Sequence, residues 1–261
     1  MNYDLVLCGV GGQGVLSIAW VIDHAVHEAG LHFKQSEVHG MAQRGGAVSA
    51  FVRISDQPVA SDLIATGAAS MVLSVEPMEA LRYTQLLRPD GWIVTDVTPL
   101  ENVDAYPEHE ALYQVLFSVP RLVALDATRL AAKAGTVKAQ NMVVLGAAAW
   151  QLPLPLDLLE KQVYELFSAK GERIAKANVN AFRMGDAASR FAATLLAAGV
   201  PSGVLARVLP RLVFEPQPVS AGSVSAWCER LLGADGAQLA MQLFQADLPV
   251  PVDQVPAAHR S

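Results

Sequence analysis

Two segments near the start of the chain combine residue types and spacing that suit the binding of an anionic ligand. The first, the glycine turn, comprises residues 9–14 and directly follows a short apolar run of leucine and valine. Glycine permits the positive φ and close backbone approach that a sharp strand-to-helix turn requires. Such a turn leaves unpaired N–H groups at the helix N-terminus, and these groups can bind phosphate. The candidate binding residues of the glycine turn are Gly9, Gly11, Gly12, Gln13 and Gly14.

The second segment, the polar loop, comprises residues 36–46 and has the sequence SEVHGMAQRGG. It combines a carboxylate, an imidazole, an amide and a guanidinium with three glycines. Binding residues gather on loops that a rigid sheet carries, particularly at the carboxyl ends of strands. We therefore expect the polar loop to meet the glycine turn at one edge of a sheet. Its candidate binding residues are Ser36, Glu37, His39, Gly40, Met41, Arg44, Gly45 and Gly46.

Plainer interpretations of both segments stay open at this point. The glycines can serve only to let a helix pack closely on a strand, and Glu37 and Arg44 can form an ion pair. A lone histidine such as His39 is more often a structural hydrogen-bonding group than an acid or base. The spacing Gly9-x-Gly11-x-x-Gly14 also matches a dinucleotide fingerprint, in which Glu37, about 20 residues further on, would hold a ribose. No second domain with a catalytic constellation follows in the sequence to complete a nicotinamide-dependent enzyme.

The elements that position these segments alternate along the chain between apolar strands and amphipathic helices. This alternation predicts an α/β fold with a doubly wound, Rossmann-like and mostly parallel sheet. We expect a turn at residues 88–91 and an N-cap at Asp157. The predicted strands are residues 5–7, 32–38, 47–54, 70–75, 92–96 and 121–124, and the predicted helices are 15–29, 78–87, 106–119, 129–134, 141–150, 157–167 and 172–196.

The composition changes near Gly199. Residues 200–261 hold seven of the fifteen prolines and no lysine. Short helices are predicted at residues 204–213, 223–232 and 238–244, followed by an extended end. Because these segments are too short for a core of their own, we expect one domain over residues 1–198. Residues 199–261 would then form a helical and partly extended C-terminal arm that docks on a partner chain.

Composition and charge exclude several functional classes. The net charge of −6 argues against nucleic-acid binding, which needs a basic face. No apolar run reaches the roughly 20 residues of a membrane-spanning helix. Two cysteines, Cys8 and Cys228, cannot hold a four-cysteine cluster, and their scarcity favours a cytoplasmic location. With 52% hydrophobic residues and 17% charged residues, the chain is expected to have a large permanent subunit interface.

Four segments together resemble a known family. They are GVGGQG, SEVHGMAQRGG, the segment EPMEAL at residues 76–81 and the segment AFRMG at residues 181–185. The chain is similar over residues 1–195 to the gamma-type domain of 2-oxoacid:ferredoxin oxidoreductases. Within that family, SEVHGMAQRGG most resembles the beta subunit of the indolepyruvate enzymes, because pyruvate-type relatives differ before the Arg-Gly-Gly ending.

The resemblance implies a division of labour between two chains. A large alpha subunit would carry thiamine diphosphate, Mg²⁺ and [4Fe-4S] clusters, decarboxylate the 2-oxoacid and pass electrons to ferredoxin. The gamma-type domain would bind coenzyme A, which accepts the acyl group, and would hold no catalytic residue and no metal. Gly11 to Gly14 would line a coenzyme or interface loop, Arg44 would supply a cation for phosphate, and Glu37 and His39 would orient the loop.

The same resemblance implies a hetero-oligomer with two copies of each chain. Two other functions stay open beside this one. The chain could be a stand-alone NAD(P)-dependent oxidoreductase, or a purely structural scaffold subunit.

Overall fold

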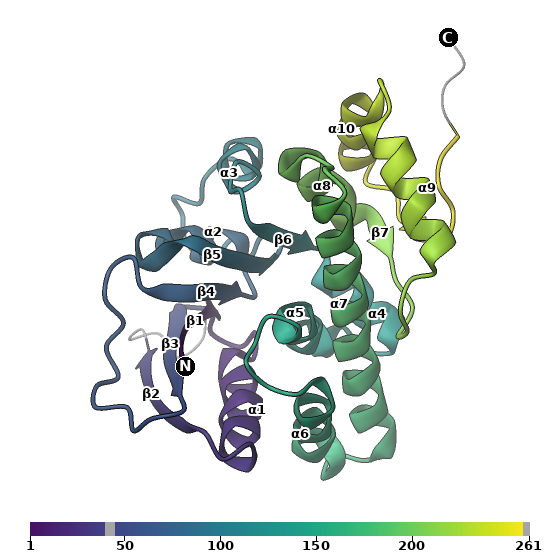
Figure 1. Cartoon of the computed structure of the whole chain (residues 1–261). Helices are drawn as coiled ribbons and strands as arrows, with labels where there is room; N and C mark the ends of the chain where they lie inside the picture. Colours follow the sequence, from purple (N-terminus) through teal and green to yellow (C-terminus); the bar gives the residue numbers. More distant parts are fainter. Residues whose placement is uncertain (40–44, 258–261) are drawn as a thin grey trace.

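The computed structural model describes residues 1–39 and 45–257, with the backbone alone at His39. A six-stranded sheet forms the centre of the fold, with the strand order β2-β3-β1-β4-β5-β6 (Figure 1). The glycine turn begins within the last residues of β1, and the segment called the polar loop begins within β2. The strands are β1 (Asn2–Val10), β2 (His32–His39), β3 (Ala47–Ser55), β4 (Ala69–Ser74), β5 (Leu87–Asp96) and β6 (Leu122–Leu125).

The sheet is mostly parallel, as the sequence predicts. Neighbouring strands from β1 through β4 and β5 to β6 are parallel, whereas β3 is antiparallel to both β1 and β2. β3 is antiparallel to its neighbour β2 because only residues 40–46 separate the two strands, and a parallel pair needs a connection of about a dozen residues or more. In the sheet, β2 and β3 therefore lie on one side of β1, and β4, β5 and β6 lie on the other side. The topological switch point lies between β1 and β4, where open α/β sheets bind ligands.

Helices cover both faces of the sheet, so successive strand residues are buried on opposite sides. Leu5 and Leu7 belong to the hydrophobic cluster beneath helices α1, α5 and α7, whereas Val6 and Cys8 face helices α2 and α3. Burial on both faces explains the unbroken apolar run that opens the chain. The helices are α1 (Val15–Glu28), α2 (Pro77–Arg82), α3 (His109–Leu116), α4 (Ala127–Ala134), α5 (Gln140–Ala149), α6 (Leu156–Ser168), α7 (Glu172–Ala197), α8 (Ser202–Val208), α9 (Ala221–Leu232) and α10 (Gly236–Ala246).

Helices α5 and α7 approach each other at backbone distance. A Cβ atom on Gly146 would lie 1.9 Å from the carbonyl oxygen of Phe182, and one on Gly185 would lie 1.9 Å from that of Val143. Side chains at these positions are therefore excluded by contact. This packing is the structural reason for the glycine that ends the segment at residues 181–185.

Two local predictions are wrong. Residues 88–91 do not separate β5 from the preceding helix; they lie within β5, at an irregularity where Ala69 pairs with Leu87 but Met71 pairs with Trp92. The extra residues are accommodated as a bulge in the strand. Asp157 is not the N-cap of α6, because Pro155 takes that position and Asp157 lies in the first turn. An acidic side chain there still interacts favourably with the helix dipole.

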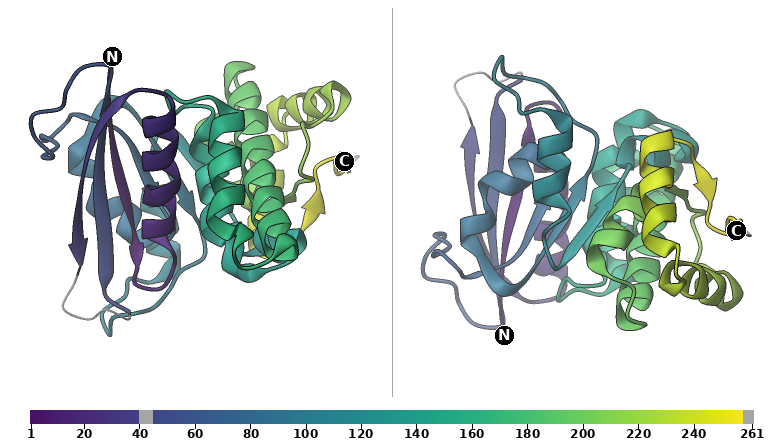
Figure 2. Two further views of the ribbon diagram at one scale, coloured as in Figure 1. Left: turned by 90° about the horizontal axis from the view of Figure 1, so that it is seen from below. Right: turned by 90° about the horizontal axis from the view of Figure 1, so that it is seen from above.

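The C-terminal arm packs against α7 and β6, at the end of the molecule away from the β2–β3 hairpin (Figure 2). Its helices α8 to α10 are accompanied by a short parallel pair, β7 (Leu212–Val213) and β8 (Val250–Pro251). Trp227 is completely buried, and its Nε1 donates to the carbonyl oxygen of Val252 at 2.8 Å. Buried apolar side chains of the arm, among them Phe214, Trp227 and Leu231, belong to the same hydrophobic cluster as Leu5 and Leu7 of the sheet. None of the described helices is long and apolar enough to cross a membrane.

Candidate functional site

The glycine turn connects β1 to α1 through two left-handed residues. Gly12 has φ +103° and Gly14, the N-cap of α1, has φ +82°. A Cβ atom on Gly14 would also lie 2.4 Å from Nδ2 of Asn141, which donates to the carbonyl oxygen of Gly14 at 3.1 Å. Gly14 is thus required both by its conformation and by the close approach of α5.

Gln13 stabilises the turn from inside. Its Oε1 accepts from the N–H of Val10 at 2.8 Å, and its Nε2 donates to the carbonyl oxygen of Val75 at 3.0 Å. The amide therefore lies between the ends of β1 and β4, at the switch point of the sheet. A dinucleotide would place its pyrophosphate against the helix N-terminus at this point. In this chain the side-chain amide of Gln13 bridges the two strand ends at that point.

An open hollow of ≈ 260 Å³ lies beside the turn. It is lined by the backbone of Val10, Gly11, Gly12 and Gly14, by Val15, Leu16 and Ser17 at the start of α1, and by Val48. The described lining residues include no charged side chain. Drug-sized ligand pockets commonly span about 300–1,000 Å³, so the hollow suits one phosphate group or the end of a longer ligand. A cation for such a phosphate has to come from a neighbouring segment.

The end of the polar loop meets the glycine turn, as predicted from the sequence. The N–H of Gly11 donates to the carbonyl oxygen of Gly46 at 2.8 Å, and β1 pairs with β3 through Val10 and Ala47. Gly45 has φ +82°, and its carbonyl oxygen accepts from Nδ2 of Asn102 at 2.7 Å. Of the candidate loop residues, Gly40, Met41 and Arg44 and the side chain of His39 lie outside the described residues.

Ser36 and Glu37 lie in β2 and not in a loop. They pair with Phe51 and Ala50 of β3, and Oε1 of Glu37 accepts from Nε2 of Gln35 at 2.7 Å. Glu37 also acts on α1: burial and, to a lesser extent, the charge of Glu37 raise the pKa of Asp23 to about 7. The charge of Glu37 thus disfavours ionisation of Asp23 on α1.

Two buried carboxylates at the same sheet edge were not predicted. Glu76 is completely buried: its Oε2 accepts from the N–H of Glu79 at 2.7 Å, and Oε1 accepts from the hydroxyl of Tyr106. Asp96, at the end of β5, accepts from the N–H groups of Thr98 at 3.0 Å and Ala127 at 3.1 Å. Burial raises the pKa of Asp96 to about 7. Because Pro77 marks the start of a helix, the sequence could have indicated Glu76 as its N-cap. No neighbouring residue marks Asp96, at the end of β5, as a buried carboxylate.

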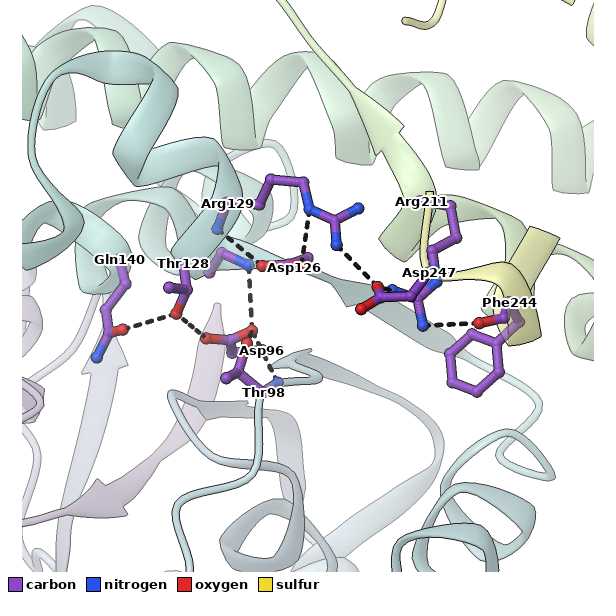
Figure 3. A network of polar contacts seen from close by, with 10 residues as sticks. Asp96, Thr98, Asp126, Thr128, Arg129, Gln140, Arg211, Phe244 and Asp247 are labelled. Carbon is purple, nitrogen blue, oxygen red and sulfur yellow. Dashed lines mark hydrogen bonds and ion pairs between the residues drawn. The ribbon is translucent and has the colours of Figure 1, made fainter. Parts of the chain in front are cut away.

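A chain of polar contacts leads from Asp96 to the C-terminal arm (Figure 3). Asp126, the N-cap of α4, accepts from the N–H of Arg129 at 2.7 Å, and the guanidinium of Arg129 reaches Asp247 at 2.9 Å. Arg211 also contacts Asp247 and donates to the carbonyl oxygen of Phe244 at 2.8 Å. These contacts connect the carboxyl ends of β5 and β6 to the segment after α10.

The fold and the site together define a class of proteins. The chain matches the crystal structure of the gamma subunit of a keto/oxoacid ferredoxin oxidoreductase from Geobacter sulfurreducens, with a TM-score of 0.51, 24% identity and coverage of 70% of this chain and 95% of that chain. The fold is thus that of the gamma subunits. Residues 4–188 match the sequence model of the pyruvate ferredoxin/flavodoxin oxidoreductase family, and the chain therefore belongs to this family.

Curated relatives narrow the class further. The chain is 36% identical to the indolepyruvate oxidoreductase subunit IorB of Archaeoglobus fulgidus, over 71% of this chain and 94% of the relative. It is 35% identical to IorB of Methanothermobacter thermautotrophicus, over 72% of this chain and 98% of the relative. The common gamma subunit of the pyruvate/ketoisovalerate oxidoreductases of Thermococcus kodakarensis is 28% identical, over 67% of this chain and 92% of that relative.

A longer protein shares the fold through the arm. The 2-oxoglutarate:ferredoxin oxidoreductase of Magnetococcus marinus matches 94% of this chain with a TM-score of 0.57 and 18% identity, although the match spans only 41% of that longer chain. The chain is therefore a subunit of a 2-oxoacid ferredoxin oxidoreductase.

Proposed function

We propose that the chain is the beta subunit of an indolepyruvate:ferredoxin oxidoreductase that acts on indolepyruvate or other aryl pyruvates. One observation supports this choice above the others. The identity to the archaeal IorB subunits is 33–36%, whereas the identity to the pyruvate/ketoisovalerate gamma subunits is 25–29%. On this basis we assign to the complex of the present chain the indolepyruvate substrate that the name of the IorB subunits gives.

In this proposal the reacting groups belong to the large alpha subunit. That subunit would hold thiamine diphosphate with Mg²⁺ and the [4Fe-4S] clusters, and ferredoxin would receive the electrons from the assembled complex. Two copies of each chain would form the complex, in the cytoplasm. The present chain would contribute to the second half-reaction, in which the acyl group leaves thiamine for coenzyme A.

The coenzyme would bind at the glycine turn and the polar loop. The first N–H groups of α1, which follow Gly14 beside the open hollow, suit a phosphate oxygen. Arg44 would add the cation that the hollow lacks, with Gly45 and Gly46 holding the loop end against Gly11. Gly9 and Gln13 would support the turn, and Ser36, Glu37, His39, Gly40 and Met41 would place the loop.

The C-terminal arm would dock on the alpha subunit. The match to the family ends at residue 188. The alignments with the four archaeal IorB relatives include 94–98% of each relative but only 71–72% of this chain. The arm is thus an addition to the region that this chain shares with those relatives. It also exposes large apolar side chains, namely Leu232, Met241 and Leu248, which a partner surface could cover.

Substrate preference in the assembled complex tests the proposal. The chain is produced together with its large partner, and reduction of ferredoxin is followed with indolepyruvate, phenylpyruvate, pyruvate and 2-oxoglutarate in turn. We expect kcat/KM to be highest for the aryl pyruvates, by at least about tenfold, which is about 1.4 kcal/mol of transition-state discrimination. A higher kcat/KM for pyruvate or 2-oxoglutarate would assign the chain to another branch of the family.

A further inference from the structure

A basic cleft lies between the short 3₁₀ segment before α5, η2 (Val137–Ala139), and the junction of α6 and α7. Its volume is ≈ 730 Å³, within the range of about 300–1,000 Å³ that small-molecule sites occupy. It shares no lining residue with the hollow at the glycine turn. The residues that matter for its chemistry are Lys138, Phe167, Lys170, Arg173, Ile174 and Lys176.

The charge of the cleft is of one sign. Four of its described lining residues are lysine or arginine and none is acidic, in a chain whose net charge is −6. Lys138 and Arg173 form no ion pair within the described part of the chain. Lys170 lies over the ring of Phe167, with Nζ 5.2 Å from the centroid. Of these four residues, Lys176 alone has an acidic partner among the described residues, Glu172 at 3.1 Å.

A neighbouring groove between α6 and α7, which shares Lys176 and Asn180 with the cleft, gives an internal comparison. Its lining includes Asp157 and Glu160 together with Lys161 and Arg183. Lys161 pairs with Glu28 at 2.5 Å, and Arg183 pairs with Glu160 at 2.6 Å. Lys161 and Arg183 are therefore neutralised within the chain, whereas Lys138, Lys170 and Arg173 of the basic cleft have no acidic partner in the described part of the chain. Like charges held together repel, and a bound anion removes this repulsion.

The cleft also has an apolar floor. Phe167 is only 9% exposed, and Ile174 is partly buried beside it in the first turns of α7. Helix α7 begins here after Gly171, so the positive end of a 26-residue helix adds to the field of the side chains. Cations around an apolar and aromatic floor complement a ligand that joins phosphate groups to an aromatic ring system.

We infer that the basic cleft binds a phosphorylated small molecule of nucleotide type, with at least two phosphate groups on Lys170, Arg173 and Lys138 and its ring system against Phe167 and Ile174. The inference does not rest on the proposed function, because the cleft and the glycine turn have separate residues. It gives the small subunit a second ligand site.

Binding of ADP to the full chain tests this inference, measured by calorimetric titration at fixed ionic strength. Three proteins are compared: the wild type, the double variant Lys170→Ala/Arg173→Ala, and the matched double variant Lys161→Ala/Arg183→Ala from the neighbouring groove. Both variants lose two positive charges. We expect ADP to bind the wild type, the cleft variant to bind at least tenfold more weakly, and the matched variant to stay within twofold. Adenosine, which has no phosphate, should bind far more weakly than ADP.

Several results would overturn the inference. The first is a wild type that does not bind ADP, even if it binds an acidic protein or a nucleic acid. The second is an equal loss in both double variants, which would indicate general charge attraction. The third is a loss with Arg44→Ala alone, which would place the phosphates at the glycine turn. Melting temperatures without ligand check folding, and if the cleft variant does not fold, Lys138→Ala takes its place with an expected loss of about tenfold.

Discussion

The two halves of one sheet edge are built in opposite ways. At the end of β1 and the start of β3 the chain presents glycines and backbone amides beside an open hollow, and the carbonyl oxygen of Gly46 accepts from the N–H of Gly11. At the ends of β5 and β6 the same edge is filled by buried or bonded side chains, from Asp96 through Arg129 to Asp247. The first half leaves donors available for a ligand, whereas the second half uses its donors to hold the C-terminal arm. One fold thereby separates a candidate binding edge from a structural one.

The largest expected effect concerns Gly14, in the open half. Gly14→Ala should destabilise the chain by about 3–5 kcal/mol, because it adds a left-handed alanine and an overpacked contact with Asn141. The matched control is Gly30→Ala, since Gly30 also has a positive φ of +71° but has no atom within 4 Å of its added Cβ. That change should cost about 1–2 kcal/mol. Denaturant unfolding measures both, and equal losses would show that the Asn141 contact is irrelevant.

The next effect concerns Asp96, in the filled half. Burial raises its pKa from 3.8 to about 7, so ionisation disfavours the folded state. The contribution of Asp96 to stability therefore falls as the pH rises from about 4 to about 7 and is constant above that range. Asp96→Asn keeps an acceptor for the N–H groups of Thr98 and Ala127 but removes the titration. The variant should gain stability relative to the wild type over this pH range, by on the order of 2–4 kcal/mol.

Asp23 allows the same comparison in the open half. Its pKa is also raised to about 7, by burial and by Glu37, so Asp23→Asn should shift stability in the same direction. The amplitude should be smaller, because Asp23 is only partly buried. Unfolding free energies at pH 4.5, 6 and 7.5 separate the two variants. A pH-independent difference between Asp96→Asn and the wild type would mean that Asp96 does not titrate in this range.

Much of the fold could be predicted because each strand is a local apolar run and each helix has its own spacing. The meeting of the glycine turn with the polar loop also followed from the sequence, since both come after strands that end at one edge. Asp96 and Glu76 could not be predicted as a buried pair of anchors, because a single carboxylate at a strand end has no spacing to identify it. Arg129 and Asp247 are 118 positions apart, and only the folded chain brings them together.

A smaller and more specific effect is expected at Arg44. In the assembled complex, Arg44→Ala should raise the KM for coenzyme A by roughly 10- to 100-fold, through loss of a charge-assisted contact of about 1.5–3 kcal/mol. The KM for the 2-oxoacid should change little, because decarboxylation is assigned to the other subunit. Arg190→Ala is the control, since the half-exposed Arg190 pairs with Asp186 at 2.8 Å within α7, away from the glycine turn. An unchanged coenzyme A constant in a normally assembled complex would remove Arg44 from the site.

The smallest effect is expected where the filled half meets the arm. Asp247→Asn keeps a residue that tolerates φ +51° but removes the charge shared by Arg129 and Arg211. Because Asp247 is largely exposed, the loss should be about 0.5–1 kcal/mol. Hydrogen exchange should locate it in α10 and the segment after it. A loss spread evenly over the sheet would contradict the view that this contact holds only the arm.

The division of labour between the two chains is the central claim, and reconstitution tests it most directly. Ferredoxin reduction is measured with indolepyruvate and coenzyme A for each chain alone and for the two chains mixed. We expect no turnover and no iron–sulfur absorbance from the small chain alone, and turnover that depends on coenzyme A from the mixture. Turnover by the small chain alone would contradict the claim. So would a coenzyme A-dependent rate of the large partner that does not change when the small chain is added.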